Sequence, residues 1–431
     1  MLSYEINPEQ KAVVHPNYRL DQLTQQTGGT AVTLNAAGGN NSLFELPPVT
    51  YNLARSVLAF DMTIAQQLND NVNAFRTLIP QIRQIQFYGR NSVMMCDLSD
   101  FDRYSKIVLA SDNTLEDMLR NPGEYPLVRS NALPNANAAR RPDTNNANLA
   151  YTEQLYVTNA ADNNPITVRY RIPLSVFKNT ILALDKDLYF GDITYFRIYW
   201  QEAGAVGFDS DDGAFAGAGA LVGPITLSNL YFYQAVETNE AINTTLRASL
   251  EKGGLNYLID YIHSNNFPLT TTAQSFYVKY GPGMGKRLKR IYWCQTSTAP
   301  ATQNLRYETA IGDGVNVVSF YTMLDSQRII QYNINCTDAG GNQDYMIMKE
   351  KMQGNTYQNS NIYKYNWFWC ESFDGMKLIE HNDNIIAGIP IDNIERKYDV
   401  NLQTANAAFT YYVFGVVQRD LKITPLGIQL I

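Results

Sequence analysis

The sequence is poor in the residues that most often build catalytic and metal centres. Its 431 residues include only three histidines and four cysteines. The histidines, His15, His263 and His381, lie far apart along the chain. None has a neighbour that completes a zinc or acid–base motif. The sequence therefore predicts no catalytic residue, no cofactor-binding residue and no metal ligand, and the chain is not expected to be an enzyme.

The four cysteines, Cys96, Cys294, Cys336 and Cys370, show no pair at the spacing of metal ligands. The N-terminal residues lack the basic and apolar regions of a signal peptide. No stretch approaches the ~20 apolar residues that span a bilayer. We therefore expect a soluble chain made in a reducing compartment, with four free thiols in its core.

Charged residues are also scarce, because Lys, Arg, Asp and Glu make up 17% of the chain, whereas about a quarter is usual. The formal net charge of −7 argues against direct nucleic-acid binding, since affinity for phosphate needs an excess of Lys and Arg. The chain is instead rich in Tyr (29) and Phe (18), and in Asn and Gln. This composition favours broad β-sheets with uncharged surfaces.

A change of hydrophobic period near the middle divides the chain into two halves. Residues 225–234 alternate like a largely buried strand, with Tyr and Phe in the second part. After them the apolar residues recur every four positions, as in a helix. Thr238 or Asn239 can cap its start, and two glycines end it. We predict a strand that completes one β-unit, followed by a linker helix within 237–254 that leads into a second.

Hydrophobic patterns predict further strands on both sides of this helix, and one helix within each half. Ser99 and Asp102 form a capping box for the helix of the first half, and a Met-rich helix is expected over 344–352. The predicted strands are 53–64, 82–88, 166–172, 193–200 and 225–234, then 257–262, 275–280, 289–293, 315–324, 362–370, 385–389, 407–418 and 421–431.

Three stretches show no such period. Residues 1–42, rich in Gln, Thr, Gly and Asn, predict an arm that stays mobile until a partner orders it. Residues 122–148 and 203–223 predict long polar or glycine-rich loops. The expected organisation is an N-terminal arm (1–42), a first β-sandwich (43–236), the linker helix (237–254) and a second β-sandwich (255–431).

The two halves also share a weak internal repeat at a constant offset of 217 residues. Ile172-Pro173 aligns with Ile389-Pro390, Leu174 with Ile391, Tyr195 with Tyr412 and Gln201 with Gln418. The offset is close to half the chain, and the predicted strands and helices follow in the same order. We therefore predict an all-β fold of two tandem eight-stranded β-sandwiches with short helices.

Several motifs resemble known sites but fail on spacing. Residues 281–286, Gly-Pro-Gly-Met-Gly-Lys, lack the first glycine and the hydroxyl residue of a phosphate-binding loop, so we interpret them as a turn. The basic residues that follow, Arg287, Lys289 and Arg290, are interpreted as protection for an edge strand or as inter-subunit charges. Residues 209–213 resemble a calcium loop without its distal Glu, and predict a solvated loop.

The order of strands and helices resembles that of the double jelly-roll major capsid proteins of tectiviruses and related icosahedral viruses. The resemblance covers residues 43–431 and rests on pattern and order, since this family has no invariant motif. The stretches that carry it are Phe44–Pro48, Ile172–Leu174, Ile225–Gln234 running into the linker helix, and Phe267–Leu269 continuing to Trp293.

This resemblance implies a homotrimer, in which six similar lobes make a pseudo-hexagonal tile of a virus shell. The loops 122–148 and 203–223 would form an outward turret, and the arm 1–42 would lie underneath, against neighbouring tiles or an internal membrane. The implied partners are neighbouring capsomers, penton and minor capsid proteins, with no direct contact to nucleic acid. The implied location is the virion, after synthesis in the host cytoplasm.

A carbohydrate-binding or adhesin-like tandem β-sandwich is the alternative. Trp367 and Trp369 share one face of a predicted strand and would stack on sugar rings. The missing export signal and the missing calcium site argue against it. A jelly-roll enzyme, such as a cupin or a glycosidase, is a third reading, which the scarcity of histidine and the lack of a distinguished carboxylate pair disfavour.

Overall fold

The structure is a computed structural model of the chain. It describes residues 16–26, 29–34, 38–64, 71–75, 79, 81–112, 154–156, 166–210, 225–270, 275–298, 309, 317–336, 343–351, 367–373, 388–404 and 408–431.

The N-terminal half forms a sandwich of two antiparallel sheets, which we call jelly roll 1. Its elements are β1 (Tyr18–Thr24), β2 (Val32–Leu34), β3 (Asn41–Leu46), β4 (Tyr51–Ile64), β5 (Asn71–Phe75), β6 (Ile82–Gly89), β7 (Met94–Leu98), α1 (Phe101–Asp112), β8 (Gln154–Tyr156), β9 (Ile166–Pro173), the 3₁₀ turns η4 (Leu174–Val176) and η5 (Ile181–Ala183), β10 (Asp187–Leu188), β11 (Thr194–Trp200), α3 (Ala203–Val206), β12 (Gly207–Ser210) and β13 (Ile225–Glu237). One sheet has the order β1-β13-β4-β10, with β2 beside β13 and β9 beside β4. The other has the order β3-β11-β6-β7.

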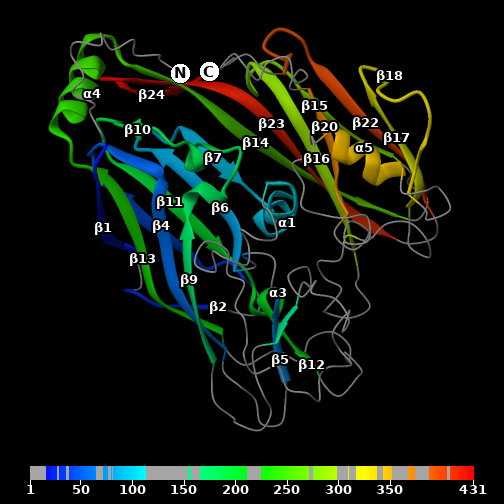
Figure 1. The fold of residues 1–431 in the computed structure, drawn as a ribbon, viewed down its shortest axis with the longest axis horizontal. Helices are drawn as coiled ribbons and strands as arrows, with labels where there is room; N and C mark the ends of the chain where they lie inside the picture. The colour runs from blue at the N-terminus through cyan, green and yellow to red at the C-terminus, as the bar shows by residue number, and fades with distance from the viewer. Residues whose placement is uncertain are drawn as a thin grey trace.

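The C-terminal half, after the linker helix α4 (Glu240–Gly253), forms a second sandwich, jelly roll 2 (Figure 1). Its elements are β14 (Leu255–Leu269), β15 (Ser275–Tyr280), β16 (Arg287–Ser297), β17 (Val317–Leu324), β18 (Gln327–Arg328), β19 (Ile334–Asn335), α5 (Gln343–Lys351), β20 (Trp369–Ser372), β21 (Ile389–Pro390), β22 (Arg396–Thr404), β23 (Phe409–Thr424) and β24 (Gly427–Leu430). One sheet has the order β14-β23-β16-β20, with β21 beside β16 and β24 beside β23. The other has the order β15-β22-β17-β18, with β19 beside β17.

The two sandwiches have the same topology, strand by strand. In the first sheets β1, β13 and β4 correspond to β14, β23 and β16, and β9 and β10, which pair with β4, correspond to β20 and β21, which pair with β16. The sheet β3-β11-β6-β7 corresponds to β15-β22-β17-β18. The helices α1 and α5 occupy equivalent places, because each follows the last strands of the second sheet. The prediction of two tandem eight-stranded jelly rolls with short helices is confirmed.

The constant offset of 217 residues is wrong. Ile172-Pro173 ends β9, which pairs with residues 57–64 of β4, whereas Ile389-Pro390 forms β21, which pairs with the first residues of β16 as β10 pairs with the first residues of β4. Tyr195 and Gln201 lie on and just after β11, whereas Tyr412 and Gln418 lie on β23, the counterpart of β13. No single offset can hold, because the connection from β11 to β13 is much longer than that from β22 to β23.

The linker helix forms where the sequence places it. The Asn239 side chain caps α4 by accepting a hydrogen bond from the Ala241 backbone N–H at 3.0 Å. At the other end Gly254 has a φ of 90°, a left-handed conformation that costs glycine little. Its N–H donates to the carbonyls of Ser249 and Leu250. The chain therefore leaves α4 directly into β14.

The irregular arm predicted for residues 1–42 is wrong for the parts of it that the structure describes. Residues 18–24 form β1, which pairs with β13 along its whole length, and residues 32–34 form β2. No hydrophobic alternation marks β1, because it lies at a sheet edge, where none of its side chains is fully buried. Jelly roll 1 therefore begins before residue 43.

The predicted loop 203–223 begins with regular structure, since residues 203–206 form α3 and residues 207–210 form β12. The rest of this loop, and the predicted loop 122–148, lie outside the described residues. A small sheet in the order β12-β5-β8 joins three separate connections of jelly roll 1. Figure 1 shows β5 and β12 at the end of the molecule opposite α4 and β24.

Aromatic side chains fill both sandwiches, and all four tryptophans are fully buried. In jelly roll 1, the Trp200 ring meets the Phe60 ring edge-on at 5.6 Å between centroids. In jelly roll 2, Trp293 packs at 4.8 Å from Trp367 and at 5.1 Å from Phe320. Such edge-to-face contacts add to the hydrophobic free energy of burial.

The close approach of β23 to Tyr280 gives a test of this packing. A side chain at Gly415 would overlap the fully buried ring and hydroxyl of Tyr280. We expect Gly415→Ala to lower the free energy of unfolding by about 1–3 kcal/mol because the core cannot expand freely. Denaturant titration measures this change. The control is Gly253→Ala, where an added Cβ would meet nothing within 4 Å. Equal effects of the two substitutions would contradict the prediction.

Candidate functional site: the joint between the two jelly rolls

The described part of the chain includes one of the three histidines and all four cysteines. His15 and His381 lie outside the described residues, and His263 lies on β14. The four cysteines are all buried and free, so the prediction of reduced core thiols is confirmed. Among the residues that the structure describes, no three His, Cys, Asp or Glu side chains are placed to hold a metal ion.

The Gly-Pro-Gly-Met-Gly-Lys stretch is the turn between β15 and β16, as predicted. The Met284 N–H donates to the Gly281 carbonyl at 3.0 Å, which closes the turn. The Lys286 ammonium pairs with Asp420, and the side chain of the next residue, Arg287, donates to the Gly388 carbonyl at 2.9 Å. These bonds occupy the basic groups that would otherwise meet a phosphate.

The basic cluster on β16 does not protect an edge strand, because β16 lies inside its sheet between β23 and β20. The Lys289 ammonium lies 2.8 Å from an Asp260 carboxylate oxygen. Arg290 donates to the Tyr292 hydroxyl at 3.2 Å. The cluster is therefore used within the chain, and the edge-strand interpretation is wrong. Of the stretch 209–213, which was predicted to be a solvated loop, Asp209 lies on β12 instead, and residues 211–213 lie outside the described part.

The tryptophans that the alternative reading needs are not available to a sugar. Trp367 is 1% exposed and Trp369 is 0% exposed. The indole N–H of Trp367 donates to Asp344 at 2.9 Å, and that of Trp369 donates to Glu371 at 2.8 Å. Both rings therefore belong to the core of jelly roll 2. The predicted stacking platform is wrong, because alternation along a strand does not tell the inner face from the outer one.

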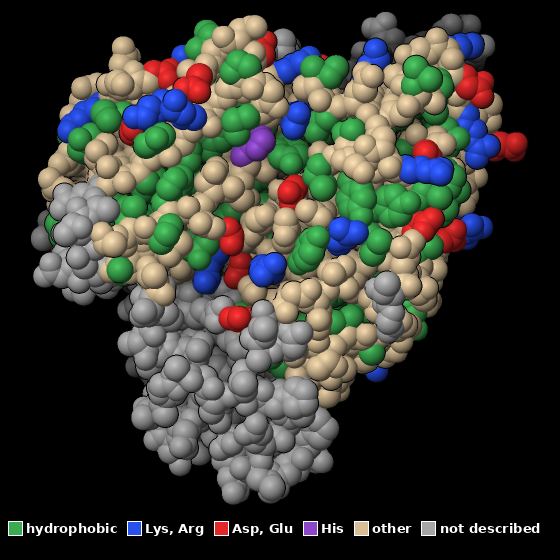
Figure 2. All heavy atoms as spheres, turned by 180° about the vertical axis from the view of Figure 1, so that it is seen from behind, with side chains coloured by type: hydrophobic (Ala, Val, Ile, Leu, Met, Phe, Trp, Pro, Cys, Tyr) green, Lys and Arg blue, Asp and Glu red, His purple; other side chains and the backbone are tan. Residues whose placement is uncertain are grey.

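Charges on the surface are few and mixed in sign. On the face that Figure 2 shows, Lys and Arg side chains of the described residues alternate with Asp and Glu among apolar and uncharged groups. A hollow of about 320 Å³ lies beside Lys286 and Asp420, but these two side chains bond to each other. No helix in the described part of the chain is long and apolar enough to cross a bilayer.

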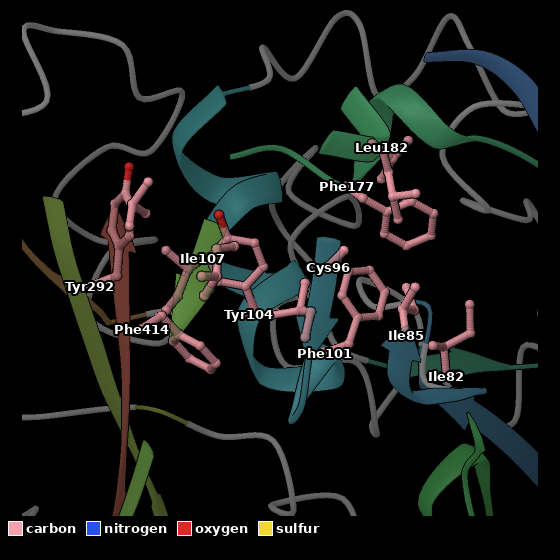
Figure 3. Packing of buried hydrophobic residues seen from close by; sticks show 14 of the residues in the cluster. Ile82, Ile85, Cys96, Phe101, Tyr104, Ile107, Phe177, Leu182, Tyr292 and Phe414 are labelled. Atoms are coloured by element: carbon pink, nitrogen blue, oxygen red, sulfur yellow. The ribbon is translucent and has the colours of Figure 1, made fainter. Parts of the chain in front are cut away.

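The most elaborate arrangement of side chains is the joint between the two jelly rolls, which α1 occupies (Figure 3). Tyr104 of α1 is fully buried, and its ring lies 5.1 Å from Phe414 on β23 and 6.5 Å from Tyr292 on β16. On the side of jelly roll 1, the Phe101 ring lies 4.9 Å from Phe177. One short helix therefore packs into jelly roll 1 and also covers the outer face of a sheet of jelly roll 2.

Hydrogen bonds fix the position of the Tyr104 ring. Its hydroxyl donates to the Lys178 carbonyl at 3.1 Å and accepts from the Asn179 side chain at 2.7 Å. The neighbouring Arg103 guanidinium lies over the Tyr412 ring, 5.3 Å from its centroid, in the geometry of a cation–π contact. A buried hydroxyl with both a donor and an acceptor partner has little freedom to reorient.

Further contacts extend the joint along the molecule. The strand β7 packs against β14, and the Asn91 side chain donates to the Ile428 carbonyl on β24 at 2.8 Å. The Tyr257 hydroxyl donates to the Asp187 carbonyl at 3.1 Å. Buried apolar residues of the two sandwiches form one continuous cluster across this boundary. The two jelly rolls are therefore fixed to each other as one body.

A polar network holds the chain where it enters β1. The Tyr18 hydroxyl donates to Asp187 at 2.7 Å, and the Asn17 N–H donates to Glu237 at 3.0 Å. Burial raises the pKa of Asp187, and its charged neighbours Glu237 and Asp185 act in the same direction. This network lies next to the start of α4, so the chain enters jelly roll 1 at the α4 end of the molecule.

Truncation of Tyr104 tests the joint. We expect Tyr104→Ala to lower the free energy of unfolding by about 3 kcal/mol or more, as for other large core truncations. Because the joint couples the sandwiches, denaturant unfolding should separate into two transitions in this variant. The matched control is Tyr104→Phe, which keeps the ring and should lose only about 1 kcal/mol. One unshifted transition in Tyr104→Ala would show that the coupling lies elsewhere.

His263 gives a pH test. Burial lowers the pKa of His263, although the bond between its Nε2 and the Met284 carbonyl, 2.9 Å long, acts in the opposite direction. The unfolded chain then binds a proton near pH 6.5 that the folded chain binds only at lower pH. Stability should therefore fall as the pH drops below about 6.5. His263→Gln should remove this part of the pH dependence, and identical profiles for both proteins would refute it.

No known protein-family profile matches the chain, and no curated protein matches its sequence. Solved structures do match over nearly the whole chain. The Faustovirus major capsid protein is 9% identical with a TM-score of 0.57, covering 97% of this chain and 92% of that one. The mavirus major capsid protein is 10% identical with a TM-score of 0.54, covering 100% and 94%. The PBCV-1 virus capsid is 10% identical with a TM-score of 0.54, covering 96% and 97%. The chain therefore has the double jelly-roll fold, and its resemblance to the double jelly-roll major capsid proteins is confirmed at the level of the fold.

Proposed function

We propose that this chain is the major capsid protein of an icosahedral virus and that it acts through its shape. The observation that carries the proposal is the joint, which makes one rigid body from two sandwiches of the same topology. Two such lobes on one chain are what a threefold particle needs in order to meet six neighbours. The similarity to capsid proteins of Faustovirus, mavirus and PBCV-1 supports the same function.

In this proposal three copies form a capsomer with six lobes. Homo-oligomers of soluble proteins generally close into rings with point-group symmetry. The small share of charged residues, 17% of the chain, favours close packing of copies, because large net fields oppose the assembly of identical subunits. The cores of obligate interfaces are likewise depleted in charge and enriched in aromatic residues.

The two ends of the molecule would then face opposite sides of the shell. The small sheet β12-β5-β8 gathers three connections at one end, which we assign to the outward turret. The α4 end, where Asn17 precedes β1, would face inward. The segment before Asn17 would meet neighbouring capsomers or an internal membrane, and penton and minor capsid proteins would complete the shell.

The proposed location is the virion, after synthesis in the host cytoplasm. Direct contact with the genome is not part of the proposal, since the basic residues of β16 are bonded within the chain. An adhesin-like function is not favoured, because Trp367 and Trp369 lie in the core.

The mass of the purified protein in solution tests this function. We expect a particle of three times the chain mass that resists dilution, because obligate interfaces bury thousands of Å². Light scattering coupled to size exclusion measures the mass, and electron microscopy of the same fraction should show three-lobed particles with a six-sided outline. A stable monomer that never forms such particles would refute the capsid function.

A further inference from the structure

The joint inside the chain has a counterpart on jelly roll 2, at the edge that carries α5. The helices α1 and α5 hold equivalent places, and each has a buried aspartate at its second position, Asp102 and Asp344, both 5% exposed. Asp102 accepts a hydrogen bond from the Gln201 side chain at 3.2 Å, and Asp344 accepts one from Trp367 at 2.9 Å. We therefore align the two helices with Asp102 of α1 at the position of Asp344 of α5.

In this register Tyr104 of α1 corresponds to Met346 of α5. Tyr104 is fully buried against the sheet of jelly roll 2, whereas Met346 is 61% exposed. Tyr332, between β18 and β19, is also 51% exposed. The strands β18 and β19 correspond to β7, which packs against β14 in the internal joint. The edge of jelly roll 2 formed by α5 and β18–β19 therefore exposes apolar side chains. The corresponding edge of jelly roll 1, formed by α1 and β7, is covered by jelly roll 2.

The surface that would cover this edge is also present on the chain. Tyr104 contacts the outer face of β23 and β16, whose counterparts in jelly roll 1 are β13 and β4. On that outer face Tyr231 and Tyr233 of β13 lie 6.2 Å apart, and Tyr233 is in register with Val57 of β4. Leu20 on the neighbouring β1 is 53% exposed.

We propose that the Met346 edge of one copy packs onto the Tyr231–Tyr233 face of the next copy and so repeats the internal joint between subunits. This inference rests on the proposed trimer and identifies the two surfaces that hold it together. Such a contact is heterologous, because each copy offers a different surface to each neighbour, and it forms a ring when the rotation closes.

The chemistry of the two surfaces suits this contact. A methionine thioether packs favourably against aromatic rings and adapts to an irregular surface. On the Tyr231–Tyr233 face, Arg171 is in register with Ala59, the neighbour of Tyr231, and already lies 3.3 Å from Asp61. A second copy would therefore meet tyrosine and leucine on this face without leaving Arg171 unpaired.

Met346→Asp tests the contact, because it places a charge in the apolar interface while the side chain is exposed in the isolated chain. We expect the mass to fall from three chains to one, with an unchanged circular dichroism spectrum and unfolding temperature. The matched control is Leu426→Asp at the β23–β24 turn, where the side chain is 98% exposed and belongs to neither surface. This control should remain a trimer.

A mixing experiment tests the heterologous geometry. Tyr233→Glu should also give monomers, because it damages the other surface. Met346→Asp chains keep an intact Tyr231–Tyr233 face and Tyr233→Glu chains keep an intact Met346 edge, so an equal mixture should form particles of two chain masses. If each surface instead paired with the same surface of another chain, the mixture would form no particles of two chain masses. That result would overturn the proposal.

The outcomes also separate this inference from the capsid function. A trimeric wild-type protein whose Met346→Asp and Tyr233→Glu variants both remain trimers would overturn the assigned surfaces and leave the capsid function standing. A monomeric wild-type protein would overturn the trimer itself. A trimer that only these two substitutions dissociate would support both.

Discussion

The outer face of the sheet β14-β23-β16 has to be kept from water, and the rest of the architecture depends on how this is done. A sandwich buries only the inner faces of its sheets, yet Phe414 and Tyr292 on the outer face are 0% and 2% exposed. The helix α1 of the other sandwich covers them through Tyr104. Burying aromatic side chains of this size contributes several kcal/mol, and it holds two otherwise independent units in one orientation.

Much of the fold could be predicted from the sequence, because most strands have a plain alternation. Residues 275–280 form β15 with the predicted bounds, and α4 begins and ends close to the predicted limits. The strand β22 was missed although Tyr398, Val400 and Leu402 alternate inward, because the polar residues between and before them resemble a loop. The strand β1 was missed for a different reason, since its pairing with β13 involves residues more than two hundred positions away.

The joint could not be predicted, because it depends on which faces meet. The apolar stripe of α1 and the aromatic residues of β23 were both visible in the sequence, but alternation assigns residues to faces without naming their neighbours. The same limit explains Trp367 and Trp369, which share a strand face that turned out to be the inner one. The expectation of no catalytic or metal site rests on composition, since such sites need residue types that this chain uses sparingly.

The covalent link through α4 changes the number of bodies that assembly must bring together. Six separate lobes would each lose translational and rotational freedom on joining a ring, at a cost estimated as several kcal/mol or more for each association. In the proposed trimer, fusion leaves three free partners instead of six. Under threefold symmetry it also makes the two kinds of lobe alternate around the ring, so that no two lobes of the same kind are adjacent.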